Sequence, residues 1–309
     1  MRMTVRRPWA WPWELRKHGI LGINKRNADL LPYVNPSCYR KLADDKVETK
    51  ALCMAHNIPV PHTYAVIECY GRVKHVEDIV GQRADFVVKP VRGASGRGVL
   101  VVVRRANGFF HLIDGRSLAP GQLRYHICAV LSGLYSLSGE PDKGIIEQRI
   151  MTHQVFEKLA VAGTPDIRLI VYQGAVVMAM LRLPTRRSRG RANLHQGAVG
   201  TGIDIETGQT FGGVFLNRMV VNHPDTGQML SGVKIPYWNS ILQIAVKLAA
   251  LIRMGYMGVD IVLDANHGPI VLEVNARPGL SVQVANRGGL IPRLHIPSGR
   301  LAAAPMAAN

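Results

Sequence analysis

Residues 86–103 read FVVKPVRGASGRGVLVVV. The β-branched runs at 86–89 and 99–103 predict two strands, and the loop at 92–98 between them is rich in glycine. Closely spaced glycines let backbone N–H groups close around phosphate oxygens, and Lys89 places a cation directly before them. An ordinary tight hairpin is the alternative. The lysine favours a flap over a nucleotide's phosphates, and residues 92–98 are called the flap below.

The flap differs from the two best-known phosphate loops. No Gly-Lys-Ser/Thr sequence closes it, and a strand follows it where those loops open a helix. The pattern therefore excludes a P-loop and a dinucleotide fingerprint.

A second informative segment lies near the C-terminus. A hairpin of strands 259–264 and 269–275, with Asp264 opposite Pro269, would place Asp260 opposite Glu273. Opposed side chains have Cβ atoms about 5 Å apart, and Asn275 shares their face. Two such carboxylates repel unless a cation lies between them, and Mg²⁺ takes hard oxygen ligands. We expect the opposite face to be apolar, formed by Val259, Ile261, Leu272 and Val274.

Hairpins separated by isolated helices predict the fold class α+β with antiparallel sheets. We expect helices at 42–57, 121–137 and 238–254, a strand at 145–150 and a hairpin of 166–172 with 175–183. Within that hairpin Asp166 and Arg168 project to one face, where an ordinary surface ion pair is the alternative. We expect an irregular region from about 198 to 235.

Composition excludes several classes. The 309 residues are 47% apolar and 19% charged, typical of a folded chain, and no apolar run approaches the roughly 18 residues of a membrane span. No apolar segment follows the basic N-terminus, which argues against a secretory signal. The four cysteines lack Cys-x-x-Cys spacing, so we expect a cytoplasmic protein without a disulfide scaffold.

The net charge of +17 is concentrated in two segments. Residues 1–26 carry seven basic residues against Glu14 alone, and residues 182–191 carry five arginines and no acid. We expect residues 1–40 to form an extended arm. Its Trp9, Trp11 and Trp13 either cover the following domain or meet an anionic membrane, and nucleic acid is a further candidate partner.

The order of motifs resembles the ATP-grasp superfamily, and within it the α-L-glutamate ligase-like, RimK-related branch. The match covers roughly residues 40–290. Its motifs are Asp45-Lys46, Val88-Lys89-Pro90 with the flap, Ile146-Glu147-Gln148, Asp166-Ile167-Arg168, Asn193-Leu194-His195, Gly258-Val259-Asp260 and Glu273-Val274-Asn275-Ala276-Arg277-Pro278-Gly279.

The resemblance implies an ATP-dependent carboxylate–amine ligase. Such an enzyme phosphorylates a carboxylate to an acylphosphate, which an amine attacks to give an amide, ADP and phosphate. ATP would lie between two α+β subdomains, at 41–143 with the flap and at 144–297 with the metal site. The basic arm at 1–40 and a disordered tail at 298–309 would flank them.

The resemblance also implies roles for individual residues. The nucleotide would be bound by Lys46, Lys89, Arg92, Gly93, Ser95, Gly96, Gly98, Glu147, Gln148, Arg149, Ile150, Asp166 and Asn193. Two Mg²⁺ ions, with Mn²⁺ as a substitute, would be held by Asp260, Glu273 and Asn275. Guanidinium groups match both carboxylate and phosphoryl geometry, which makes Arg168, Arg191 and Arg277 the candidate catalytic residues.

The sequence departs from the family pattern in two respects: a short N-terminal segment leaves the acceptor open, and a longer connector from Glu147 to Asp166, together with Arg277, makes glutamate only the default amino acid to be added. Only about 45 residues precede the Asp45-Lys46 helix, where family members carry a segment that helps bind the acceptor, and Arg277 stands where they tend to have a small residue. The acceptor is therefore left open between a protein or peptide, a small molecule, and a cell-envelope or sugar-linked metabolite. A catalytically inactive, basic nucleic-acid-binding protein of the same fold is the remaining alternative.

Overall fold

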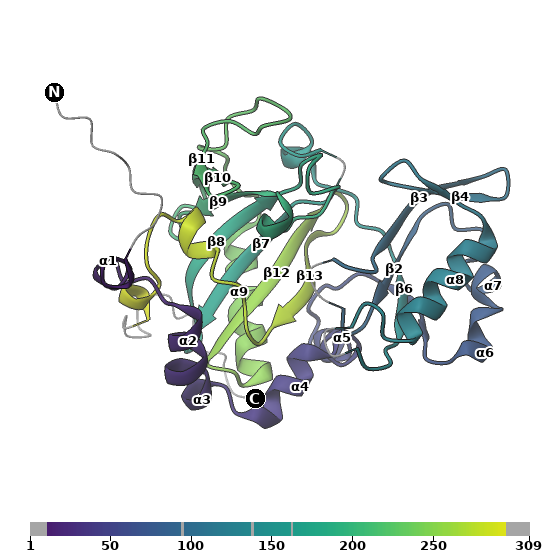
Figure 1. The fold of residues 1–309 in the computed structure, drawn as a ribbon, viewed down its shortest axis with the longest axis horizontal. Coiled ribbons are helices and arrows are strands. Elements are labelled where there is room, and N and C mark those ends of the chain that lie inside the picture. The colour runs from purple at the N-terminus through teal and green to yellow at the C-terminus, as the bar shows by residue number, and fades with distance from the viewer. Residues whose placement is uncertain (1–10, 94–95, 137–138, 162, 295–309) are drawn as a thin grey trace.

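The computed structural model describes residues 11–93, 96–136, 139–161 and 163–294. Two antiparallel sheets, each covered by helices, lie side by side (Figure 1). No helix in these ranges is both long and apolar enough to cross a membrane. The predicted tail at 298–309, with Trp9 and Ser95, lies outside the described residues.

The first sheet has six strands in the order β1-β6-β2-β3-β4-β5. They are β1 (Thr63–Ile67), β2 (Phe86–Pro90), β3 (Leu100–Ala106), β4 (Phe109–Leu112), β5 (Ser117–Leu118) and β6 (Gly144–Glu147). The helices of this part are α6 (Tyr70–Val73), α7 (Val76–Val80) and α8 (Pro120–Leu131). Its core includes Phe86 and Phe110, whose rings meet edge to face 5.6 Å apart. Strands β2 and β3 pair across the flap as predicted.

The second sheet has seven strands in the order β11-β10-β9-β8-β7-β12-β13. They are β7 (Asp166–Tyr172), β8 (Ala175–Leu183), β9 (Val199–Ile203), β10 (Thr210–Phe215), β11 (Arg218–Met219), β12 (Tyr256–Asp264) and β13 (Gly268–Asn275). Helix α9 (Trp238–Ile252) packs on it through Ile241, Ala245 and Leu248, the apolar face that its sequence predicts. Helix α10 (Val282–Ala285) contacts β8, β9 and β10. Short 3₁₀ turns lie at Gln154–Phe156, Leu194–Gln196 and Ile291–Arg293.

Residues 11–40 are largely helical where an extended arm was predicted. The segment contains α1 (Pro12–Lys17), α2 (Ile23–Lys25), a π-helical turn (Arg26–Leu30), α3 (Leu31–Val34) and the start of α4 (Ser37–Asp44). Helix α5 (Lys46–Ala55) follows within the range 42–57, where a helix was predicted. Leu21 and Leu31 are buried with residues of the second sheet and α10, and this packing holds helices too short to be stable alone. Trp11 and Trp13 stack on each other and are 44% and 54% exposed, so these two indoles do not cover a core.

Three further expectations differ from the structure. The region expected to be irregular contains β9, β10 and β11, where Gly200, Gly202 and Gly213 leave room for Leu194, Phe211 and Leu230. Strand β6, placed by the sequence in the second subdomain, pairs with β1 and β2 of the first sheet. Helix α5 buries Cys53 in the core of the second sheet, although its sequence position lies before the first.

The C-terminal hairpin pairs Asp260 with Glu273 as predicted, but its connection and its register differ from the prediction. Asp264 lies opposite Gly268 and not Pro269. The register then shifts at a β-bulge between the pairs Ile261–Val271 and Asp260–Glu273, which places Asp260 opposite Glu273. Leu272 is the extra residue of the bulge. It therefore packs with Ile150 and away from the core that buries Val259, Ile261 and Val274, contrary to the prediction.

Candidate functional site

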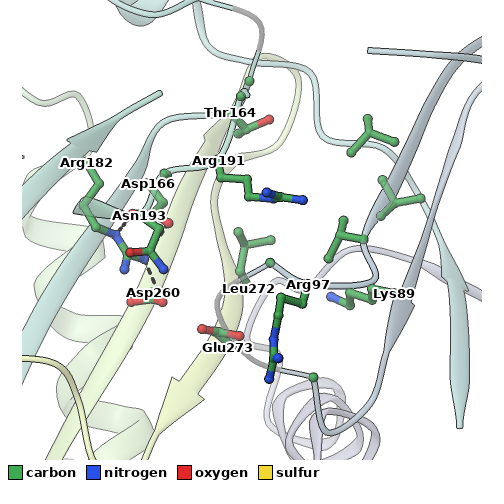
Figure 2. Close-up of a pocket in the computed structure, with 18 of the residues that line it drawn as sticks. Lys89, Arg97, Thr164, Asp166, Arg182, Arg191, Asn193, Asp260, Leu272 and Glu273 are labelled. Atoms are coloured by element: carbon green, nitrogen blue, oxygen red, sulfur yellow. Dashed lines mark hydrogen bonds and ion pairs between the residues drawn. The ribbon is translucent and has the colours of Figure 1, made fainter. Parts of the chain in front are cut away.

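A cavity of about 1060 Å³ lies between the two sheets. Residues from β2, the flap, the segment after β6, β7, β8, residues 189–195 and β13 line it (Figure 2). Its lining is strongly basic, with eleven Lys and Arg against six Asp and Glu. The basic residues are Lys46, Lys89, Arg92, Arg97, Arg116, Arg149, Arg168, Arg182, Arg189, Arg191 and Arg277, and the acidic ones are Asp44, Asp114, Glu147, Asp166, Asp260 and Glu273.

Glu147 fixes the lysine that precedes the flap. Its carboxylate accepts from Lys89 and from Lys50 of α5, each Nζ at 2.6 Å, and the side chain is 4% exposed. Burial alone would raise the pKa of Glu147, but the two ammonium groups outweigh burial and lower that pKa. Glu147 therefore acts as the counter-ion that orients Lys89. No role was predicted for Lys50, although it lies one helical turn after Lys46.

Gln148, Arg149 and Ile150, which were predicted to contact a nucleotide base, line the cavity. Gln148 exchanges hydrogen bonds with the backbone of His62, and Arg149 pairs with Asp85 at 3.1 Å. Ile150 and Leu272 form an apolar wall there. The wall is suited to the flat face of a ring.

The flap is anchored at both ends. At its start the backbone N–H of Arg92 donates to both oxygens of Asp142, at 2.9 and 3.1 Å. Lys46 Nζ donates to the carbonyls of Val91 and Gly93, at 2.9 and 3.0 Å, so it holds the root of the flap. At the other end the carbonyl of Gly98 lies 2.9 Å from His126 Nε2.

Two flap glycines are required by the backbone. Gly96 has φ +68° and Gly98 has φ +73°, in the left-handed region that favours glycine. A Cβ at Gly98 would also lie 2.6 Å from the ring of Tyr135.

Four charged side chains form a buried network across β7, β8 and β12. Arg168 makes a two-pronged ion pair with Asp260, and Arg182 makes one with Asp166. Arg182 also reaches Asp260 at 2.8 Å, so the network is continuous (Figure 2). Cross-strand register explains the pairs, because Asp260 lies opposite Arg168 and Asp166 lies opposite Arg182.

The network sets the ionisation of its carboxylates. Burial would raise the pKa of Asp260, but Arg168 and Arg182 hold it well below its usual range. Burial raises the pKa of Asp166 to about 6, with Arg182 opposing that rise and the Asp260 charge adding to it. Asp166 therefore titrates close to neutral pH.

Asp260, Glu273 and Asn275 come together as the hairpin predicts. Asn275 Nδ2 lies 3.4 Å from Asp260 Oδ2 and 3.4 Å from Glu273 Oε1. Glu273 is 34% exposed and faces the cavity, 3.8 Å from Lys46 Nζ.

Comparison with known protein families identifies the family to which the chain belongs. Residues 25–296 match the family model described as sugar-transfer associated ATP-grasp. The chain belongs to this ATP-grasp family. Its fold is accordingly the ATP-grasp fold of α+β class, with antiparallel sheets in both halves.

The ATP-grasp chain is similar to proteins of related branches. It is 28% identical over 247 residues to a probable alpha-L-glutamate ligase of Maridesulfovibrio salexigens, and 27% identical over 250 residues to one of Syntrophotalea carbinolica. Each match covers 80% of this chain but 60% of the relative. A biotin carboxylase of Campylobacter jejuni, solved as a β,γ-ATP complex, shares the fold at TM-score 0.53 and 15% identity, over 87% of this chain and 50% of that one.

A divalent ion of the kind ATP-grasp proteins use fits some of these residues better than others. Carboxylate and amide oxygens suit Mg²⁺, and Glu273 with Asn275 can offer them to the cavity. Asp260 is different, because its oxygens already accept three guanidinium N–H groups. Among the described residues, no group of three or more His, Cys, Asp or Glu side chains is arranged so that it could hold a metal ion. We therefore expect Glu273 and Asn275 to hold the ion, with Asp260 as a ligand only where Arg168 moves away.

The predicted catalytic arginines of this ATP-grasp chain occupy different environments. Arg168 is 6% exposed and is bound to Asp260, so it is not free to hold a substrate as predicted. Arg191 and Arg277 are exposed at the cavity. Asn193 also lies at the cavity, where its side chain accepts from the N–H of His195 at 3.0 Å and begins a 3₁₀ turn.

Sequence reasoning missed four residues of this site. Arg182 and Arg189 lie in the arginine-rich segment, which was recognised only as a charge patch. Lys50 and Asp142 act on Glu147 and on the flap, and only the helical spacing of Lys50 from Lys46 pointed to either.

Proposed function

We propose that the protein is an ATP-dependent ligase that joins a carboxylate to an amine through an acylphosphate. The observation that carries the proposal is that Lys89, the flap and Glu273 face one cavity between the two sheets. A carboxylate is a poor electrophile until one of its oxygens becomes a phosphate leaving group. Phosphoryl transfer to it needs positioning and charge neutralisation more than a covalent protein group, and this cavity supplies both.

Each part of the cavity has a role in that reaction. Lys89 and the flap would hold the phosphates of ATP, with Lys46 keeping the flap root in place. Ile150 and Leu272 would contact the base. Glu273 and Asn275 would hold Mg²⁺, which supplies charge neutralisation to the phosphates. Arg191 and Arg277 would bind the substrate carboxylate or the group in transfer.

For the substrates we propose chemical classes only. The relatives named as probable alpha-L-glutamate ligases make an amino acid a reasonable amine, and the family description suggests a sugar-linked carboxylate. Since the chain spans 60% of the length of those relatives, their substrates do not transfer directly. We also propose a cytoplasmic location, where ATP is available and the cysteines stay reduced.

The test is ADP formation from ATP and Mg²⁺ with candidate carboxylates and amines, alone and together, with mass spectrometry of the products. We expect ADP release only when a carboxylate and an amine are both present, and a product mass equal to their sum less one water. ADP release that does not depend on the carboxylate or the amine would argue against the ligase. Salt-sensitive binding of nucleic acid without ATP turnover would argue for the inactive nucleic-acid-binding alternative.

A further inference from the structure

Helix α1 stands outside the cores of the protein. Every residue from 11 to 18 is exposed, and the helix itself contains no buried residue. A helix of six residues is too short to be stable in water through its own hydrogen bonds. Packing against the described part of the chain therefore does not account for the side chains that α1 presents to solvent.

Three apolar side chains come together on this helix. The rings of Trp11 and Trp13 stack with their centroids 4.7 Å apart, although about half of each side chain is exposed. Leu15, also exposed, lies one helical turn after Trp11, since its N–H donates to the Trp11 carbonyl at 3.1 Å. Single exposed apolar residues are ordinary on protein surfaces, whereas contiguous ones mark interaction sites.

Two cations border the stacked indoles. Arg16 and Lys17 lie three and four residues after Trp13, on the side of the helix that Trp13 occupies. Neither makes an ion pair with a carboxylate of the described residues. Glu14, the one acid of α1, accepts a hydrogen bond from the backbone at the start of the helix, at 2.9 Å. Residues 1–10 add three arginines and no acid to the sequence.

The surface formed by Trp11, Trp13, Leu15, Arg16 and Lys17 is called the α1 surface below. It combines exposed indole and leucine side chains with unpaired positive charge. A partner that covers it must therefore offer both an apolar region and negative charge.

The α1 surface is held in place by the residues that follow it. The Gly19 carbonyl accepts from the N–H of Ile291 at 3.0 Å, and a Cβ on Gly19 would lie 2.5 Å from the ring of Pro292. The Leu21 backbone exchanges two hydrogen bonds with the Gln283 side chain, at 2.8 and 3.0 Å. Figure 1 shows α1 at the end of the molecule away from the first sheet. A flat partner on this surface would leave the cavity between the two sheets open.

We propose that the α1 surface binds an anionic lipid bilayer. Indole rings favour the boundary between headgroups and acyl chains, a leucine side chain leaves water there, and arginine and lysine pair with anionic headgroups. A bilayer fits better than nucleic acid, because Leu15 offers a base neither a stacking face nor a hydrogen bond, and each indole already stacks on the other. The inference goes beyond the ligase reaction and does not depend on it.

Tryptophan fluorescence of the full chain measures this contact. Three of the four tryptophans lie within residues 9–13, and the fourth, Trp238, is buried in the core of the second sheet. A shift of the emission to shorter wavelength on addition of vesicles therefore reports burial of the indoles at 9–13. We expect this shift with vesicles of equal parts phosphatidylglycerol and phosphatidylcholine, and binding at least about tenfold weaker to phosphatidylcholine alone.

Two double variants test the apolar and the charged part of the α1 surface by co-sedimentation with the anionic vesicles. One carries Trp11→Ala and Trp13→Ala, and the other carries Arg16→Glu and Lys17→Glu. Each should bind at least about tenfold more weakly than the wild type. Because α1 contains no buried residue, both should unfold at nearly the wild-type temperature.

The matched control reverses two cations elsewhere. Arg72→Glu with Lys74→Glu changes exposed residues at α6, beside the first sheet, and should leave vesicle binding unchanged. Absence of a fluorescence shift in the wild type would overturn the proposal, and so would equal binding by the wild type and the variant reversed at Arg16 and Lys17. RNA binding that is tighter than vesicle binding at the same salt concentration would assign the α1 surface to nucleic acid and would also refute the proposal.

Discussion

Lys89 Nζ lies 2.6 Å from one oxygen of Glu147, and Lys50 Nζ lies 2.6 Å from the other. Lys89 and Glu147 belong to the first sheet, whereas Lys50 lies on α5, which packs against the core of the second. One buried carboxylate therefore joins the two halves at the floor of the cavity and fixes a lysine there. Stability and nucleotide binding should depend on it together.

Replacing Glu147 by Gln should destabilise the protein and weaken ATP binding. Loss of one partner from a buried ion pair leaves uncompensated charge and costs about 3 kcal/mol or more. Glu68→Gln is the matched control, because Glu68 accepts from Lys143 at the same 2.6 Å but on the exposed surface. We expect that change to cost less than about 1 kcal/mol. Equal loss in urea unfolding for the two variants would contradict the role given to Glu147.

Removing the Asp142 carboxylate should loosen the flap. Asp142→Ala leaves the N–H of Arg92 without its acceptor, so the flap root is held mainly by Lys46. Trypsin should then cut after Arg97 several-fold faster than in the wild type, and ATP with Mg²⁺ should slow the cleavage. If Asp142→Ala and the wild type are cut at the same rate, Asp142 does not anchor the flap.

Asp166 should make stability depend on pH in an unusual direction. Its pKa is about 6 in the folded protein, above the usual 3.8, so the folded state holds the proton more tightly. The tighter proton binding of Asp166 therefore adds fully to the free energy of unfolding at pH values below the pKa of this group in the unfolded chain. The stabilisation is lost as the pH rises through 6. Relative to Asp166→Asn, the wild-type free energy of unfolding should therefore fall by about 1.4 kcal/mol from pH 5 to pH 8. A difference that stays constant over this range would show that Asp166 does not titrate there.

Substitution of Arg168 should lower the stability of the protein, whereas substitution of Arg191 should lower its activity. Arg168→Met removes two of the groups that satisfy buried Asp260, so we expect a loss of about 3–5 kcal/mol. Arg191→Met removes an exposed side chain, and its effect on stability should stay within about 0.5 kcal/mol while ligase turnover falls. Thermal unfolding and ADP formation on both variants measure the two effects. The reverse pattern would restore Arg168 as the substrate-binding arginine.

Much of the site's framework followed from local patterns. The hairpin of β7 with β8 and the helix α9 depend on neighbouring residues, so their sequences predicted them. The pairing of Asp260 with Glu273 was also right, but a shorter connection and a bulge at Leu272 produced it. A bulge is set by packing against the rest of the sheet, and the alternation of a single strand does not reveal it.

What the sequence could not predict depends on contacts between distant segments. Helix α5 lies where a helix was predicted, but the face that it buries, with Lys50 and Cys53, is determined by Glu147 and by the core of the second sheet. Asp166 with Arg182 and Arg168 with Asp260 pair only once three strands are in register. A charged residue that was predicted to bind substrate can therefore be ion-paired instead with a buried carboxylate from another strand, as Arg168 is with Asp260.

Magnesium-dependent ATP binding to the wild type and to Glu273→Gln tests the central claim most directly. The account places the divalent ion on Glu273 and Asn275 and the phosphates beneath the flap. Calorimetry should show that Mg²⁺ tightens ATP binding to the wild type at least about tenfold, and that Glu273→Gln loses most of this gain while it still binds ATP without metal. The same magnesium-dependent gain in both proteins would contradict the account.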